Sequence, residues 1–229
     1  TIIAGYGADT ARWFMLSDTP PERDIEWTDA GIEGAWRFVQ RVWRLVNALA
    51  EHRAAPGEAT VPDATVAEMR KAAHKALVAV EADIESLAFN RAVARIYELV
   101  NALQKPLAAD GATRLPAEAV DECGRFLVTM FSPMMPHLAE ACWERFGFEG
   151  IAARAAWPEA DRALVEEEAI TLPVQVNGKK RAEITVEKGT APDAIEEAVL
   201  AMEEVRRHLG GRDAKRVIVV PERIVNVVG

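Results

Sequence analysis

The period of the hydrophobic pattern changes near residue 168 of this chain. Before that point, apolar residues recur every three or four positions over long stretches, which is typical of amphipathic helices. After it, apolar and polar residues alternate on both sides of Asn177-Gly178, which indicates a β-hairpin. A helix requires a period near 3.6 residues and a strand requires a period of two, so the two parts of the chain differ in secondary structure. We therefore expect a mainly α-helical bundle followed by a small α+β domain.

Long helices account for most of the first part. Five are predicted, over residues 28–51, 64–82, 84–103 and 117–131, and from Ser132-Pro133 to Phe146-Gly147. A shorter helix is expected to begin at Asp9 or Thr10 and to end before Thr19-Pro20-Pro21. Long helices joined by short loops pack as an antiparallel bundle.

The second part is predicted to contain four strands and one helix. Two strands flank Asn177-Gly178, and residues 192–209 are helical by composition up to Gly210-Gly211. Pro221 separates two further apolar strands. The predicted domains are a connector over 1–27, a helical bundle over 28–165, an acidic linker over 166–170 and an α+β domain over 171–229.

The net charge of −9 argues at first against a nucleic-acid partner, because phosphate binding needs positive potential. The charge is unevenly distributed. Residues 1–168 hold 17 Lys and Arg against 27 Asp and Glu, whereas residues 169–229 hold 10 against 9. An acidic chain can still bind RNA when its cations are gathered on one surface.

The chain lacks the motifs of catalysis and of metal binding. It has no Walker or GxGxxG phosphate loop and no HExxH or GxSxG motif, and its four histidines lie singly. Cys123 and Cys142 have no CxxC partner and are predicted to be buried thiols. No uninterrupted apolar stretch approaches the roughly 18 residues of a membrane helix. We expect no catalytic residue, metal or cofactor in the chain, no membrane contact, and a cytoplasmic location.

Two groups of arginines lie on predicted helices of the bundle. Arg37, Arg41 and Arg44 have a spacing that puts them on one face of the longest helix, opposite its apolar stripe. Arg91 and Arg95 form a similar pair on the third helix. Guanidinium groups pair well with phosphates. The same spacing also suits a solvated face balanced by glutamates, so both interpretations stay open.

In the second part, basic residues lie mostly next to turns. Lys179-Lys180-Arg181 follows the hairpin turn, Arg206-Arg207 ends a helix, and Lys215-Arg216 precedes a strand. Cations on loops of a rigid scaffold suit contacts with backbone phosphates. From the residues alone, RNA binding and simple solubility are equally acceptable interpretations.

The tryptophans of the bundle fall within apolar helical patterns. Trp36, Trp43 and Trp143 are therefore predicted to belong to the core. This assignment leaves the predicted binding surface without an aromatic stacking platform.

Several strings of residues resemble leucyl-tRNA synthetases. YGADTAR at 6–12, PPERDIEW at 20–27 and GIEGAWRF at 31–38 resemble the segment that follows the KMSKS loop in that family. FNRA at 89–92, ELVN at 98–101 and SPMMPHLAE at 132–140 resemble the anticodon-binding-type bundle shared by leucyl, isoleucyl and valyl enzymes. The resemblance covers nearly the whole chain.

The end of the chain favours the leucyl family among the three. VQVNGK at 174–179 and VPERIVNVV at 220–228 resemble the compact C-terminal domain of bacterial leucyl enzymes. Isoleucyl enzymes commonly end in a cysteine-rich zinc module and valyl enzymes in a coiled coil, and neither signature is present. The equivalent part of a valyl or isoleucyl enzyme remains an alternative, as does a protein-interaction scaffold.

The resemblance implies a part of an enzyme that binds and positions tRNA(Leu). The ATP- and Mg-dependent attachment of leucine is then expected in a catalytic domain outside this chain, which is itself inactive. The family implies that the bundle lies along the inside of the tRNA and that the last domain reaches its elbow. We expect a monomer that does not bind DNA. The candidate tRNA-binding residues are Arg37, Arg41, Arg44, Arg91, Arg95, Lys179, Lys180, Arg181, Lys215, Arg216 and Arg223.

Overall fold

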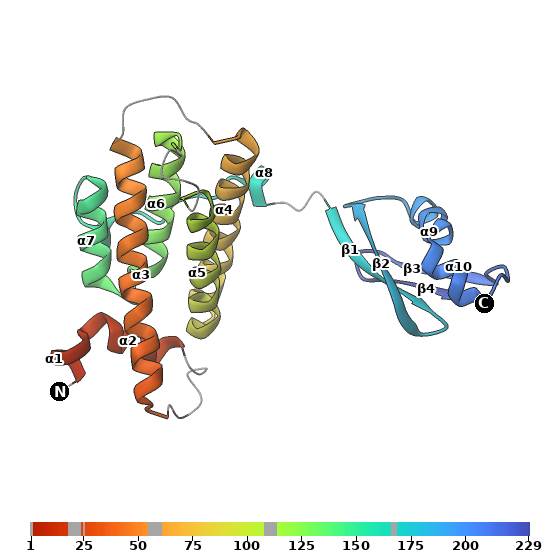
Figure 1. Cartoon of the computed structure of the whole chain (residues 1–229), viewed down its shortest axis with the longest axis horizontal. Helices are drawn as coiled ribbons and strands as arrows, with labels where there is room; N and C mark the ends of the chain where they lie inside the picture. The colour runs from red at the N-terminus through yellow and green to blue at the C-terminus, as the bar shows by residue number, and fades with distance from the viewer. Residues whose placement is uncertain (1, 18–23, 25, 55–60, 108–113, 166–168) are drawn as a thin grey trace. The chain divides into compact units, whose positions relative to one another are not determined.

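The chain divides into two compact units, Thr1–Val165 and Glu166–Gly229. The computed structural model describes residues 2–17, 24, 26–54, 61–107, 114–165 and 169–229 (Figure 1). The predicted helix end at Thr19-Pro20-Pro21 and residues 166–168 of the predicted acidic linker lie outside the described residues. Ala169 and Ile170 already belong to a strand, so the sheet begins earlier than the predicted start of the last domain.

Unit 1 is made of helices. They are α1 (Ile2–Tyr6), α2 (Ala8–Ser17), α3 (Asp29–Ala54), α4 (Asp63–Glu85), α5 (Phe89–Gln104), η1 (Lys105–Leu107), α6 (Ala117–Phe131), α7 (Pro136–Phe146), η2 (Ala152–Arg154) and α8 (Arg162–Val165). Helix α3 packs on α2, α6 and α7, and α4 packs on α5 and α6. No helix in the described part of the chain is both long and apolar enough to span a membrane.

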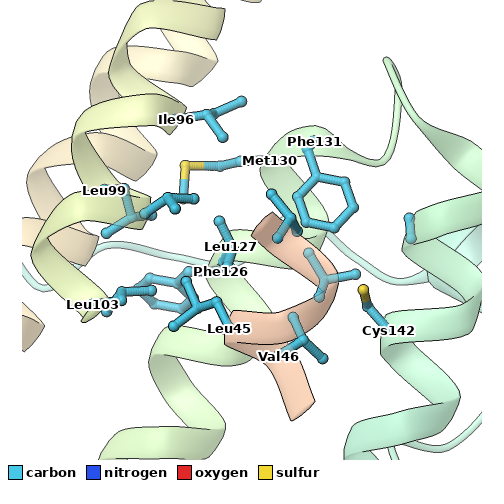
Figure 2. Packing of buried hydrophobic residues seen from close by; sticks show 14 of the residues in the cluster. Leu45, Val46, Ile96, Leu99, Leu103, Phe126, Leu127, Met130, Phe131 and Cys142 are labelled. Atoms are coloured by element: carbon cyan, nitrogen blue, oxygen red, sulfur yellow. The ribbon is translucent and has the colours of Figure 1, made fainter. Parts of the chain in front are cut away.

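The core of unit 1 lies where α3, α5, α6 and α7 meet. Figure 2 shows apolar side chains of α5 and α6 facing one another, with those of α3 and Cys142 of α7 close by. The labelled side chains, which are buried, are Leu45, Val46, Ile96, Leu99, Leu103, Phe126, Leu127, Met130, Phe131 and Cys142. Complete burial of one such large side chain contributes about 1.5–3 kcal/mol. The core therefore holds the long helices in place.

Helix α2 also belongs to this core, although the sequence assigns residues 1–27 to a connector. Trp13 is fully buried, and its ring stacks on Phe38 of α3 at 4.9 Å between centroids. Its indole N–H donates to the Tyr97 hydroxyl on α5 at 3.4 Å. These contacts join α2 to two helices of the bundle, because a tryptophan ring offers both a large apolar surface and one donor.

The last long helix begins later than predicted. Helix α7 starts at Pro136, whereas Ser132-Pro133 was expected to start it. Arg12 of α2 donates from Nε to the Met134 carbonyl at 3.0 Å and from Nη2 to the Pro133 carbonyl at 2.8 Å. These two carbonyls accept from a side chain instead of from a helical N–H. The tertiary contact therefore stabilises a turn where the local sequence favours a helix.

Unit 2 is a four-stranded sheet with two helices. Its strands are β1 (Ala169–Val176), β2 (Lys179–Glu187), β3 (Arg216–Val220) and β4 (Ile224–Val228), and its helices are α9 (Pro192–Ala201) and α10 (Glu203–Leu209). The strand order is β2-β1-β4-β3, with β1 and β4 parallel and the other pairs antiparallel. Extended backbone at Met202 divides the helix predicted over 192–209. The predicted fold class, a helical bundle followed by an α+β domain, is confirmed.

Helices α9 and α10 cover one face of the sheet (Figure 1). The residues buried between the sheet and the helices are Leu172, Val174, Val176, Ile195, Val199, Val205, Leu209, Val225 and Val227. The opposite face carries exposed side chains, including Thr171, Glu183 and Ile218. This alternation of buried and exposed residues follows from the two-residue period of a strand.

Candidate nucleic-acid interface

The three arginines predicted on one face of α3 differ in their surroundings. Arg37 pairs with Glu33 at 3.7 Å in an exposed contact, which contributes little to stability. Arg41 is half-buried, and its Nε donates to Gln104 Oε1 of α5 at 2.9 Å. Arg44 is exposed and forms no hydrogen bond or ion pair with the described residues. Of the three arginines, Arg44 is therefore the most accessible to a binding partner. Arg41 also links α3 to α5.

Arg91 and Arg95 share one buried carboxylate. Asp83, near the end of α4, has a side chain only 5% exposed. Arg91 Nη2 lies 2.8 Å from Asp83 Oδ1, and Arg95 Nε lies 2.8 Å from Asp83 Oδ2. The Asp83 carbonyl also accepts the Ala88 N–H at 2.7 Å. This pair of arginines therefore stabilises the turn between α4 and α5, whether or not it also contacts RNA.

Replacing Asp83 by Ala is expected to destabilise unit 1 by about 1–3 kcal/mol, because the hydrogen bond from Arg95 and the ion pair with Arg91 are lost. Urea unfolding followed by circular dichroism measures this change. Glu81→Ala, at an exposed position of the same helix, is the matched control and should change stability by less than about 0.5 kcal/mol. Equal losses for the two variants would mean that Asp83 has no special role in the turn.

In unit 2, two basic groups that are distant in sequence lie at the same end of the sheet, on its two edge strands. Lys179 pairs with Val176, Val176 with Val227, and Val227 with Val217 across the four strands. Lys180 follows Lys179, and Arg216 precedes Val217. With about 4.8 Å between neighbouring strands, the two groups lie roughly 14 Å apart. The sheet-end cluster consists of Lys179, Lys180, Arg181, Lys215 and Arg216.

The hairpin turn that supports this cluster is bonded to the neighbouring strand. Asn177 and Gly178 have φ values of 52° and 78°, as the Asn-Gly pair of a tight hairpin requires. The Asn177 N–H donates to the Val227 carbonyl at 2.9 Å, and its Oδ1 accepts the Gly229 N–H at 3.1 Å. Asn226 Oδ1 accepts the Gly178 N–H at 3.3 Å. These contacts fix the backbone from which Lys179 and Lys180 project.

Most of the cluster has no counter-charge in the structure. Lys180 Nζ pairs with Glu183 at 2.5 Å in an exposed contact. The other four side chains are exposed and form no hydrogen bond or ion pair with any residue that the structure describes. Arg223 lies in the β3–β4 turn, at the opposite end of the sheet from Arg216. The structure therefore brings five of the six candidate cations of unit 2 together and leaves Arg223 apart.

The predicted burial of the tryptophans is correct for Trp143 and wrong for the other two. Trp143 is 2% exposed, whereas Trp36 and Trp43 are 41% and 36% exposed. Residues 36 and 43 lie two turns apart on α3 and share a helix face with the polar Gln40 and Asn47. Both tryptophans lie at the edge of the apolar stripe of α3. The sequence prediction missed this exposed aromatic pair because the spacing of apolar residues does not show where the buried part of the stripe ends.

The described residues contain no group of three or more His, Cys, Asp or Glu that would hold a metal ion. Cys123 and Cys142 are both buried, as predicted. Burial raises the pKa of each thiol to about 12, because the interior disfavours the thiolate. The two cysteines are therefore packing residues.

The described residues form a helical bundle and a small domain with exposed cations at one end of its sheet. The profile of the family described as the anticodon-binding domain of tRNA ligase matches residues 67–199, and the chain belongs to that family. Leucine–tRNA ligases of Sinorhizobium medicae and Maricaulis maris are each 53% identical to it, and each match covers 99% of the chain. The predicted resemblance to the leucyl family is confirmed.

The same region occurs in a solved structure of similar fold. The LeuRS–tRNA–LeuAMS ternary complex from Agrobacterium radiobacter K84 is 33% identical, with a TM-score of 0.80 over 99% of this chain and 29% of the other. The chain spans about a quarter of the length of the leucine–tRNA ligases, since each match covers 26% of the relative.

Proposed function

We propose that this chain binds and positions tRNA(Leu) as part of a cytoplasmic leucine–tRNA ligase. The attachment of leucine, with ATP and Mg²⁺, takes place in a part of the enzyme outside this chain. In this proposal the chain binds and orients the tRNA and contributes no catalytic group. The observation that carries this proposal is the sheet-end cluster, in which four exposed cations have no counter-charge among the described residues.

The binding mode that fits these residues is contact with backbone phosphates. Lysine and arginine side chains at a sheet end neutralise phosphates without reading base edges. Unit 2 is the better candidate for the main contact, because unit 1 carries an excess of acidic residues. Arg44 and Arg37 on α3 are secondary contacts in this proposal. Three other arginines of the bundle already bond to neighbouring helices, so an RNA contact would be additional to this structural role. They are Arg41, Arg91 and Arg95.

A titration of the purified chain with tRNA(Leu) tests the proposal. We expect binding at about 50 mM salt that weakens steeply toward 200 mM, since each neutralised phosphate contributes roughly 0.9 to the logarithmic salt slope. Duplex DNA of similar length should compete poorly, and the complex should contain one copy of the chain. Absence of binding at low salt would contradict the proposal. A protein partner that survives nuclease treatment would then favour the scaffold alternative.

A further inference from the structure

Two exposed tryptophan–arginine pairs lie two turns apart on α3. Trp36 is followed by Arg37, and Trp43 is followed by Arg44. All four side chains are exposed. In the described part of α3, the two tryptophans are the large apolar side chains that remain exposed, so this face carries aromatic rings and no exposed large aliphatic side chain. Tryptophan is enriched in binding surfaces, because its ring offers a large apolar face together with one donor.

These two rings differ from the buried tryptophans of the bundle in having no partner among the described residues. Trp13 and Trp143 donate their indole N–H groups to the Tyr97 hydroxyl and to a backbone carbonyl. Trp36 and Trp43 make no hydrogen bond and no aromatic ring contact with any residue that the structure describes. Their faces are therefore available to a ligand with a flat aromatic group of its own.

The spacing of the two pairs suits a strand of nucleotides. Seven residues advance about 10.5 Å along a helix and fall about 20° short of two full turns. Trp36 and Trp43 therefore lie on one line along α3, and Arg37 and Arg44 lie on a second line roughly 100° around the helix. The distance between the tryptophans is about three times the 3.4 Å rise per nucleotide of a stacked DNA strand. The two rings are therefore placed to receive two separate bases.

The charge around the rings is positive, although the whole chain is acidic. Residues 34–50 include three arginines and no acidic residue, in a chain whose net charge is −9. The flanking carboxylates, Glu33 and Glu51, each already lie 3.7 Å from an arginine. Arg44 has no counter-charge among the described residues, and the ion pair of Arg37 is exposed and therefore weak. This stretch of α3 thus combines aromatic rings with the local positive potential that phosphates require.

We propose that Trp36 and Trp43 are stacking platforms for unpaired RNA bases, and that Arg37 and Arg44 contact the phosphates of the same strand. An aromatic ring accepts any base, because every base has a π-face. The site therefore takes single-stranded nucleotides, whose bases can turn outward, and does not take duplex RNA, whose bases stack on one another. This inference rests on the proposed tRNA binding, and it gives unit 1 a mode of contact different from the phosphate contacts of unit 2.

Fluorescence anisotropy of the full chain with a labelled single-stranded RNA of about twelve nucleotides, within the range of single-strand binding sites, tests the inference. A duplex RNA of the same length is the comparison, and salt of about 200 mM weakens contacts with phosphates alone. The double variant Trp36→Leu with Trp43→Leu keeps the charge and loses both rings. It should bind the single strand at least about tenfold more weakly and the duplex less than about twofold more weakly.

Trp36→Phe with Trp43→Phe is the matched control, because phenylalanine still stacks, and it should keep most of the affinity for the single strand. Equal losses for the leucine and phenylalanine variants, or equal losses on single strand and duplex, would overturn the inference. Circular dichroism checks the fold. If the leucine double variant is unfolded, Trp36→Leu against Trp36→Phe is the pair to compare, with the same difference expected.

A parallel titration with tRNA(Leu) at about 50 mM salt separates this result from the proposed function. A wild-type chain that binds tRNA(Leu), with no effect of the leucine variant on the single strand, would overturn the stacking site alone. Ring-dependent binding of the single strand without binding of tRNA(Leu) would support the stacking site and contradict the proposed function. A wild-type chain that binds neither RNA would contradict both.

Discussion

Reversal of charge at Lys179, Arg181, Lys215 and Arg216 together is expected to weaken tRNA binding by roughly a hundredfold at about 100 mM salt. These four side chains are exposed at one end of the sheet of unit 2 and have no counter-charge among the described residues. Each lost phosphate contact should also reduce the logarithmic salt slope by roughly 0.9. Filter binding or fluorescence anisotropy over a series of salt concentrations measures both quantities.

The control for this prediction uses the opposite end of the same sheet. The test variant carries Lys179→Glu and Arg216→Glu, and the control variant carries Lys188→Glu and Arg223→Glu. The two double variants change the net charge by the same amount, and all four side chains are exposed. The first pair should weaken binding about tenfold more than the second, because only the first lies in the sheet-end cluster. Equal effects of the two double variants would show that net charge, rather than this surface, governs the affinity. Circular dichroism confirms that each variant is folded.

Replacement of Trp13 by Ala is expected to destabilise unit 1 by about 3–5 kcal/mol. The side chain is fully buried, stacks on Phe38 and donates to Tyr97. Its loss leaves a large cavity where α2, α3 and α5 meet and removes a large apolar contact of α2. Urea unfolding followed through the helical signal at 222 nm gives the change in free energy.

Trp36→Ala is the matched control, because it removes the same side chain at a position that is 41% exposed. Its cost should stay below about 1 kcal/mol, as for most surface substitutions. Similar losses for the two variants would contradict the assignment of Trp13 to the core and of Trp36 to the surface. A cost below 1 kcal/mol for Trp13→Ala would show that α2 is not needed for the stability of the bundle.

The fold class was predictable because it depends on local signals. The three-to-four residue period predicted the long helices, and Asn177-Gly178 predicted the hairpin, whose φ values suit only a few residue types. The helix boundaries were less predictable. Helix α5 starts after a turn in which Leu87 has a φ of 56°, whereas the apolar period runs on without interruption. The period reports which face is apolar, but it does not report where the chain turns.

The candidate site was predictable only as a set of cations. The sequence indicated the candidate basic residues for phosphate binding, and left open which of them already have partners. Arg91 and Arg95 bind Asp83, which lies in the preceding helix, and Arg41 bonds to Gln104 of a different helix. Trp36 and Trp43 are exposed although they occur in an apolar pattern. Each of these outcomes depends on which neighbour packs against a given helix face.

The sequence by itself determined the two architectures, the hairpin and the family resemblance, because repeat period, turn chemistry and motif strings act between residues that are near in the chain. Only the tertiary structure decided which cations stand free. Lys179 and Arg216 lie at the same end of the sheet because β1 and β4 pair in parallel, and that pairing joins segments far apart in sequence. The physical reason is that the effect of a charge depends on its neighbours in space, and long-range packing sets those neighbours.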